Sequence, residues 1–83
     1  MTNFKSMKFR VKSWEHSREI QTTLFKLGYR WSTLGDRHSY LEFPSLYTDS
    51  SGGIFFGFHG VWFEDQPHEE CKVEAGEIVR LLN

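Results

Sequence analysis

A change in hydrophobic periodicity early in the chain constrains the fold more than any other feature. Residues 8–12, Lys-Phe-Arg-Val-Lys, alternate charged and apolar side chains, which is the period of a half-buried strand. From Trp14 onward the apolar spacing becomes three or four, which predicts a helix over residues 14–27. Ser13 is a preferred N-cap and Gly28 a preferred left-handed C-terminal residue, so both helix ends are marked. We therefore expect a strand followed by an amphipathic helix.

Shorter patterns predict the remaining elements. The C-terminal residues 75–82 are expected to form a short helix, because Ile78 and Leu82 are spaced by four. The whole chain of 83 residues is expected to be one domain, 1–83, with residues 1–7 loosely ordered. The predicted fold class is α+β: a mainly antiparallel sheet, one main helix packed on one face and the short C-terminal helix. The expected strands after the main helix are 29–31, 39–43, 46–48, 54–58, 61–64 and 71–73.

Residues 54–64 concentrate aromatic side chains, and strand alternation sorts them into two faces. We expect His59-Gly60 to be the two-residue loop of a hairpin. Gly57 then lies opposite Trp62, and Phe55 lies beside them on a face away from the main helix. The wholly apolar face, expected to pack as core, holds Ile54, Phe56, Phe58, Val61 and Phe63.

The same alternation gives the first strand a basic face. Lys8, Arg10 and Lys12 lie opposite Phe9 and Val11, which we expect to face the core. If both helices cover the other side of the sheet, these cations share an open surface with the second aromatic face. If the C-terminal helix covers that aromatic face instead, its rings form a second small core.

The charge distribution is asymmetric although the net charge is only −1. Residues 1–37 carry eight Lys or Arg and three Asp or Glu, and residues 38–83 carry two and eight. Such a chain is expected to neutralise itself on folding, to associate head to tail as a homo-oligomer, or to offer a basic face to a polyanion.

No pattern of residues indicates catalysis, a cofactor or a metal. The single cysteine, Cys71, and the four histidines match no zinc-binding spacing, and no glycine-rich phosphate loop is present. We therefore expect a non-enzymatic protein with no cofactor and no metal site. No stretch resembles a signal peptide or a membrane span, so we expect no membrane association and a location in the cytoplasm.

One segment carries a resemblance. The helix-start sequence Ser13-x-Glu15-His16-Ser17 and the exit Leu27-Gly28-Tyr29-x-Trp31, followed by Leu46-Tyr47-x-Asp49 and Gly53-Ile54, resemble small uncharacterised accessory proteins encoded by bacteriophages. The resemblance spans roughly residues 8–57. It implies a protein that binds and redirects a host or anti-phage defence component in the host cell cytoplasm. Trp14 departs from the pattern, which has proline at the first helical position.

Two functions follow as hypotheses. The first is a non-enzymatic phage accessory protein that binds and inhibits or redirects a host or defence protein through an aromatic and charged sheet surface. The alternative is a nucleotide-binding or single-stranded nucleic-acid-binding protein, whose rings stack on bases and whose cations meet phosphates. The candidate binding residues are Phe55, Trp62, Lys8, Arg10, Lys12 and Trp14.

Overall fold

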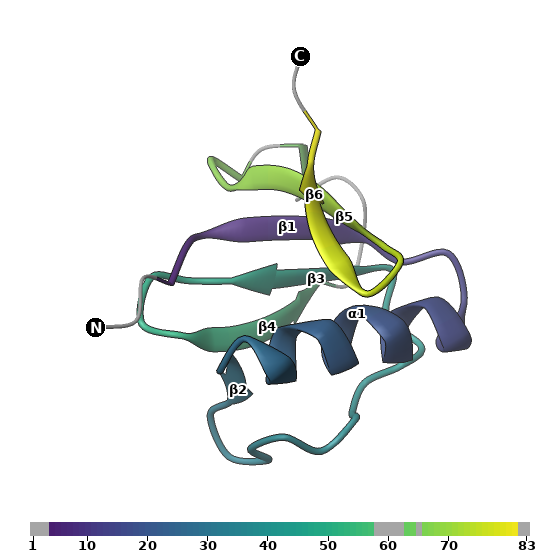
Figure 1. Cartoon of the computed structure of the whole chain (residues 1–83), viewed down its shortest axis with the longest axis vertical. Coiled ribbons are helices and arrows are strands. Elements are labelled where there is room, and N and C mark those ends of the chain that lie inside the picture. Colours follow the sequence, from purple (N-terminus) through teal and green to yellow (C-terminus); the bar gives the residue numbers. More distant parts are fainter. Residues whose placement is uncertain (1–3, 58–62, 65, 82–83) are drawn as a thin grey trace.

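A computed structural model describes residues 4–57, 63–64 and 66–81. In these residues one helix packs across a six-stranded sheet, so the expected α+β class is confirmed (Figure 1). The elements in chain order are β1 (Met7–Arg10), α1 (Trp14–Lys26), β2 (Arg30–Trp31), β3 (Ser45–Thr48), β4 (Gly53–Gly57), β5 (Glu69–Glu74) and β6 (Glu77–Arg80).

The sheet is mixed, so the prediction of a mainly antiparallel sheet is wrong. Its strand order is β2-β4-β3-β1-β5-β6. The pairs β1–β3, β3–β4 and β5–β6 are antiparallel, whereas β2–β4 and β1–β5 are parallel. Parallel neighbours need long crossover connections, and local sequence patterns do not reveal which distant strands they bring together.

The helix forms where the sequence predicts it, because both ends are marked. Ser13 is the N-cap, and its hydroxyl accepts the backbone N–H of His16 at 3.0 Å. After the C-cap Leu27, Gly28 adopts the expected left-handed backbone with φ of 100°. The buried stripe of α1 consists of Ser17, Ile20, Gln21, Thr23 and Leu24.

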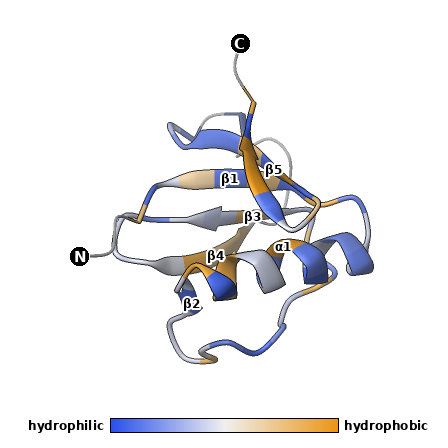
Figure 2. Ribbon diagram, viewed as in Figure 1, coloured by the Kyte–Doolittle hydropathy of each residue, from blue (hydrophilic) through white to orange (hydrophobic). Residues whose placement is uncertain are grey.

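The main core lies between α1 and one face of the sheet, which we call the front face. Ile20 and Leu24 from the helix meet Phe9 and Leu46, which are paired across β1 and β3. All four side chains are fully buried. Figure 2 shows hydrophobic residues of β4, which include the core residue Ile54, next to the helix. Burial of this apolar area is the main force that holds the helix on the sheet.

Gln21 is a polar residue inside this core, and all of its hydrogen-bonding capacity is used. Its Nε2 donates to Ser17 Oγ at 3.1 Å and to the Ser39 carbonyl at 2.7 Å. Its Oε1 accepts from Trp31 Nε1 at 3.2 Å and from the Ser39 backbone N–H at 2.9 Å. One side chain therefore fastens α1 to β2 and to the long connection between β2 and β3.

The residues before β1 are also fastened to the sheet. The sequence predicts that residues 1–7 are loosely ordered. Of these, residues 1–3 lie outside the part of the chain that the structure describes. Phe4 packs edge-on against Tyr29, with ring centroids 4.8 Å apart. The Lys5 carbonyl accepts a hydrogen bond from Thr48 Oγ1, and the Lys5 backbone N–H donates to the Tyr29 hydroxyl. These contacts fasten the segment before β1 to β3 and to Tyr29, the residue that precedes β2.

The predicted C-terminal helix is wrong, because residues 69–80 form the β5–β6 hairpin. Ala75 and Gly76 are its two central turn residues, with φ of 54° and 77°. Two successive positive φ values are typical of the tight turn that matches strand twist. Cys71 and Val73 alternate with exposed residues along β5, a period-two pattern that outweighs the spacing of the last apolar residues.

The predicted strand at 39–43 is also wrong, because this segment belongs to the connection between β2 and β3. Both backbone polar groups of Ser39 are bound by Gln21 rather than by a neighbouring strand. Tyr40 then takes a left-handed backbone, with φ of 54°. A tyrosine in this region interrupts any extended run. The strand over residues 46–48 is confirmed and begins one residue earlier, at Ser45.

Replacing Gln21 with methionine is expected to destabilise the fold. The change leaves the indole Nε1–H of Trp31 and both backbone polar groups of Ser39 without partners. Each unsatisfied buried group costs about 1–3 kcal/mol. We expect a loss of about 3 kcal/mol in the free energy of unfolding, measured by urea denaturation. The exposed helix variant Glu19→Met is the control and should change stability by less than about 0.5 kcal/mol. A loss in Gln21→Met no larger than in Glu19→Met would contradict this role.

Replacing Ala75 with asparagine is expected to stabilise the hairpin. An alanine pays a steric cost of about 1 kcal/mol in the left-handed region, and asparagine before glycine is preferred in this turn. We expect a gain of about 0.5–1 kcal/mol, seen as a higher urea midpoint. Ala75→Val should lower the midpoint, because a β-branched residue is strained at positive φ. The opposite order of the two variants would mean that the turn is built differently.

Candidate functional site

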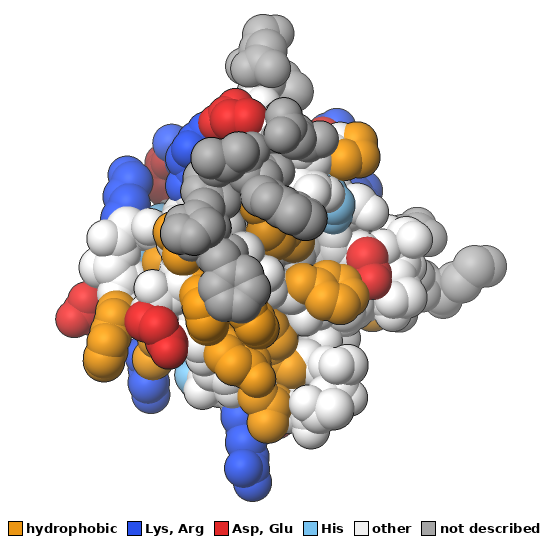
Figure 3. Space-filling view, turned by 180° about the vertical axis from the view of Figure 1, so that it is seen from behind, with side chains coloured by type: hydrophobic (Ala, Val, Ile, Leu, Met, Phe, Trp, Pro, Cys, Tyr) orange, Lys and Arg blue, Asp and Glu red, His pale blue; other side chains and the backbone are white. Residues whose placement is uncertain are grey.

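The sheet face opposite α1, the back face, carries one row of side chains through four neighbouring strands. Phe55 of β4 lies opposite Tyr47 of β3, Tyr47 opposite Lys8 of β1, and Lys8 opposite Glu70 of β5. Phe55 and Lys8 therefore share a face, with Tyr47 between them. Figure 3, which views the molecule from behind, shows hydrophobic side chains gathered at the centre of this face.

The basic row of β1 is not an open surface, in contrast to the expectation. Lys8 is 7% exposed, and its Nζ donates to the carbonyls of Phe63 at 2.7 Å and Gln66 at 3.2 Å. Arg10 is more exposed and forms ion pairs with Glu64 and Glu70. Both cations lie over the Phe63 ring, at 4.6 Å and 4.3 Å from its centroid. These cations therefore hold the chain after β4 against the sheet.

The predicted hairpin of residues 54–58 with 61–64 is wrong at Phe63 and Glu64, the residues of its second strand that the structure describes. Phe63 and Glu64 have helical backbone, and β4 pairs instead with β3 and β2. Phe63 is buried, as expected, but on the back face beside Tyr47 rather than against the helix. Trp62 lies outside the described residues, so its prediction as a site residue stays a prediction.

Gly57 does leave room for a neighbouring ring, but the ring belongs to Tyr47. A Cβ atom at Gly57 would lie 2.6 Å from Tyr47 Cε2. The Tyr47 ring therefore occupies the space beside Gly57. Tyr47 is nearly buried, so this contact closes the centre of the back face.

The remaining candidates lie apart from this row. Lys12 follows the end of β1 and is exposed, and its backbone N–H donates to His16 Nδ1 at 3.0 Å. Trp14 is the first residue of α1 and is 64% exposed. The structure thus brings together Phe55, Lys8 and Arg10 on one face and leaves Lys12 and Trp14 at the start of the helix.

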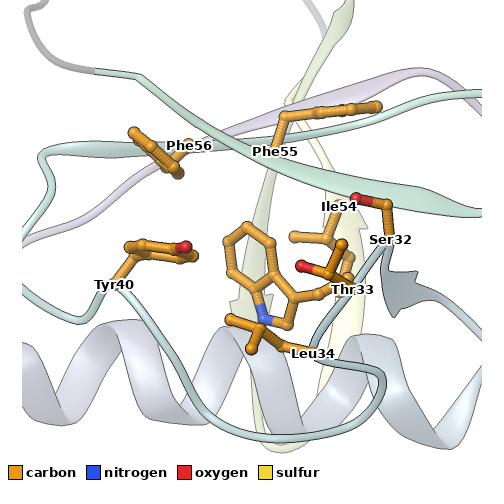
Figure 4. Close-up of a pocket in the computed structure, with 8 residues that line it drawn as sticks. Ser32, Thr33, Leu34, Tyr40, Ile54, Phe55 and Phe56 are labelled. Carbon is orange, nitrogen blue, oxygen red and sulfur yellow. The ribbon is translucent and has the colours of Figure 1, made fainter.

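Sequence reasoning missed a pocket at the sheet edge where β2 ends beside β4. The pocket has a volume of about 330 Å³. Figure 4 shows Tyr40 and Phe56 on one side of it and Ser32, Thr33 and Ile54 on the other. Phe55 is the one predicted site residue that contributes to the wall. The lining residues are Trp31, Ser32, Thr33, Leu34, Tyr40, Ile54, Phe55 and Phe56.

The aromatic walls of this pocket come from three separate parts of the chain. The Tyr40 ring lies 5.1 Å from that of Trp31 and 4.5 Å from that of Phe56, centroid to centroid. Phe43 stacks on Phe56, with ring centroids 4.2 Å apart. Because Tyr40 is on an irregular connection, no periodicity places it here; the only signal in the sequence is the density of rings in the segments 29–31, 40–47 and 54–56.

The titratable groups of the described residues show no arrangement typical of catalysis. Burial, with the nearby Glu69 carboxylate, raises the pKa of Cys71 to about 11, so its thiolate is scarce at neutral pH. Burial lowers the pKa of His68, and the neighbouring Lys8 lowers it further. In the part of the chain that the structure describes, no three His, Cys, Asp or Glu residues are grouped in a way that fits a metal ion.

The charge asymmetry is partly neutralised inside the chain. Arg10, from the basic half, pairs with Glu64 and Glu70 from the acidic half. Arg80 and Lys72 pair with acidic neighbours within the β5–β6 hairpin. Such exposed pairs contribute little stability each, but they reduce the basic potential that a polyanion would meet. Association of copies through the charge asymmetry stays a prediction.

Comparisons with protein-family models, with curated proteins and with solved structures found no match for this chain. The resemblance to bacteriophage accessory proteins therefore stays a prediction. Among the described residues, α1 included, no helix has the length and apolar character needed to cross a membrane.

Acidification is expected to destabilise the protein through two histidines. Burial lowers the pKa of His68 and of His38, whose Nε2 lies 2.7 Å from Thr22 Oγ1. Both imidazoles therefore take up protons more readily in the unfolded chain, so stability falls as the pH drops below about 6.5. We expect a lower urea midpoint at pH 5.5 than at pH 7.5.

The double variant His38→Gln/His68→Gln isolates this contribution. Glutamine does not titrate, so the difference in urea midpoint between the two pH values should shrink relative to the unsubstituted chain. An unchanged difference would assign the acid sensitivity to other groups.

Proposed function

We propose that this chain is a non-catalytic binding protein that docks onto a partner protein through the aromatic end of its back face. The observation that carries the proposal is the Phe55 ring, which is 46% exposed in the middle of a paired strand. A large ring held by rigid backbone and left open to solvent is the kind of residue that dominates binding energy at protein interfaces.

The surroundings of Phe55 support this role. Tyr40, from the connection between β2 and β3, adds a second ring that is 38% exposed next to the same pocket. Arg10 with its two glutamates supplies a charged border farther along the face. An apolar centre with a polar rim is the usual anatomy of an interface. Following the phage resemblance, the partner class we propose is a host or anti-phage defence protein.

The alternative, binding of a nucleotide or a single-stranded nucleic acid, receives less support. Stacking rings are present, but the Lys8 amine is buried between two carbonyls and Arg10 is paired with carboxylates. A phosphate would have to compete with these contacts. Binding to a short oligonucleotide that weakens steeply with added salt would favour this alternative over protein docking.

Replacing Phe55 with alanine is expected to weaken partner binding without unfolding the protein. The immobilised chain is first used to isolate a bacterial partner, and the purified partner is then titrated calorimetrically. Loss of a central interface ring costs about 2 kcal/mol or more, so we expect at least about 30-fold weaker binding.

Leu27→Ala is the matched control, because Leu27 is 50% exposed but lies at the end of α1. It should leave the affinity within about twofold. Equal affinities for the Phe55→Ala and Leu27→Ala variants would refute docking through this surface.

A further inference from the structure

The pocket beside β2 has the composition of a small-molecule site. Its volume of about 330 Å³ is at the lower end of the range for ligand pockets. Four of its eight lining residues are aromatic, two are aliphatic and two, Ser32 and Thr33, carry hydroxyl groups. A mostly apolar wall with a few polar groups on one side is typical of sites that bind and orient one compound.

One of its walls is held in a costly conformation. Tyr40 has a φ of 54°, in the left-handed region that a bulky residue seldom occupies. The preceding residue, Ser39, is bound by Gln21 at both its N–H and its carbonyl, which maintains this backbone. The result is a tyrosine ring placed against Trp31 and Phe56 with 38% of the residue exposed. Strain that the surroundings maintain is a recognised feature of ligand sites.

The opposite wall is equally fixed. The backbone N–H of Trp31 donates to the Gly35 carbonyl at 2.9 Å, and the backbone N–H of Gly35 donates to the Trp31 carbonyl at 3.1 Å. This closed turn contains Ser32, Thr33 and Leu34. The indole Nε1 of Trp31 is bound to Gln21, so the ring cannot turn away from the core. A ligand would therefore not have to order these walls on binding.

The lining defines the chemistry of the ligand. None of the eight lining residues is charged, so nothing in the described wall would neutralise a phosphate or a carboxylate. Within the described part of the chain, the hydroxyls of Ser32 and Thr33 form no hydrogen bond with another residue. They are free to meet one polar group at the edge of a ring whose faces lie against the aromatic walls.

We propose that this pocket binds a small, uncharged planar aromatic compound, with its ring against Tyr40 and Phe56 and its polar edge toward Ser32 and Thr33. The site is a second activity of the fold and does not rest on the docking function proposed above. Phe55 and Tyr40 border both the pocket and the docking surface, so the two proposals are separated by what is measured: binding of a small ring compound for the pocket, and affinity for a partner protein for the docking surface.

The test uses indole as the probe, followed by two-dimensional NMR on the full chain. We expect saturable shifts at the Trp31 Nε1–H and the Gly35 amide, with a Kd of about 1 mM or below for so small a compound. Cyclohexylmethanol, a saturated ring with one polar group, should bind at least about tenfold more weakly. No saturable shift with indole, or equal binding of the saturated ring, would overturn the proposal.

Variants of Tyr40 test the wall itself. Tyr40→Gly accepts the left-handed backbone without strain and removes the ring, so it should stay folded and bind indole at least about tenfold more weakly. Tyr40→Phe keeps the ring and should retain the affinity, and Trp14→Ala, a change in an exposed ring elsewhere, should have no effect. Undiminished binding by a folded Tyr40→Gly protein would overturn the proposal.

Discussion

The hydrogen bonds of the Gln21 side chain are the interaction on which the other features of this fold depend. The main core alone would hold α1 on the sheet, but it would not determine the path of the chain between β2 and β3. By binding Ser17, Trp31 and both polar groups of Ser39, the Gln21 amide connects the helix, a sheet edge and an irregular segment. Because every donor and acceptor of the amide is used, burying it costs little, while losing it would leave several groups unpaired.

A second consequence concerns the two faces of the sheet. The front face is closed by the helix, and most of β1 on the back face is closed by its own cations. Lys8 holds two carbonyls of the following segment, and Arg10 covers the same Phe63 ring while pairing with carboxylates. Exposed aromatic surface therefore remains at the β4 end of the sheet, around Phe55 and Tyr40. Phe55 lies on the back face there, whereas Tyr40 packs on Trp31 and Phe56 at the edge of the sheet, and both proposals made above concern that end.

Elements with local signals were predicted well. The helix was correct to within a residue because Ser13 and Gly28 mark its ends, and β1, β3 and β4 followed from alternation and from the turn residues between them. The incorrect C-terminal helix has a local cause. Short C-terminal segments satisfy helical and strand spacing equally, and Ala75 gives no local sign of its positive φ. Among the candidate site residues, Phe55 lines the pocket. Tyr40 was not among them, because its position depends on the hydrogen bonds of Gln21 to the preceding residue, Ser39, rather than on a period.

The sequence by itself determined the elements that carry local signals: a capped helix, and strands whose alternation sets which side chains of β1, β3 and β4 share a face. These follow from backbone geometry and side-chain chemistry within a few neighbouring residues. Only the tertiary structure decided which strands are parallel neighbours, where the Lys8 amine finds its acceptors and how a left-handed Tyr40 meets Trp31 and Phe56. Those features join residues far apart in the chain, and the free energy that selects them comes from packing and hydrogen bonds that form only once the whole domain has assembled.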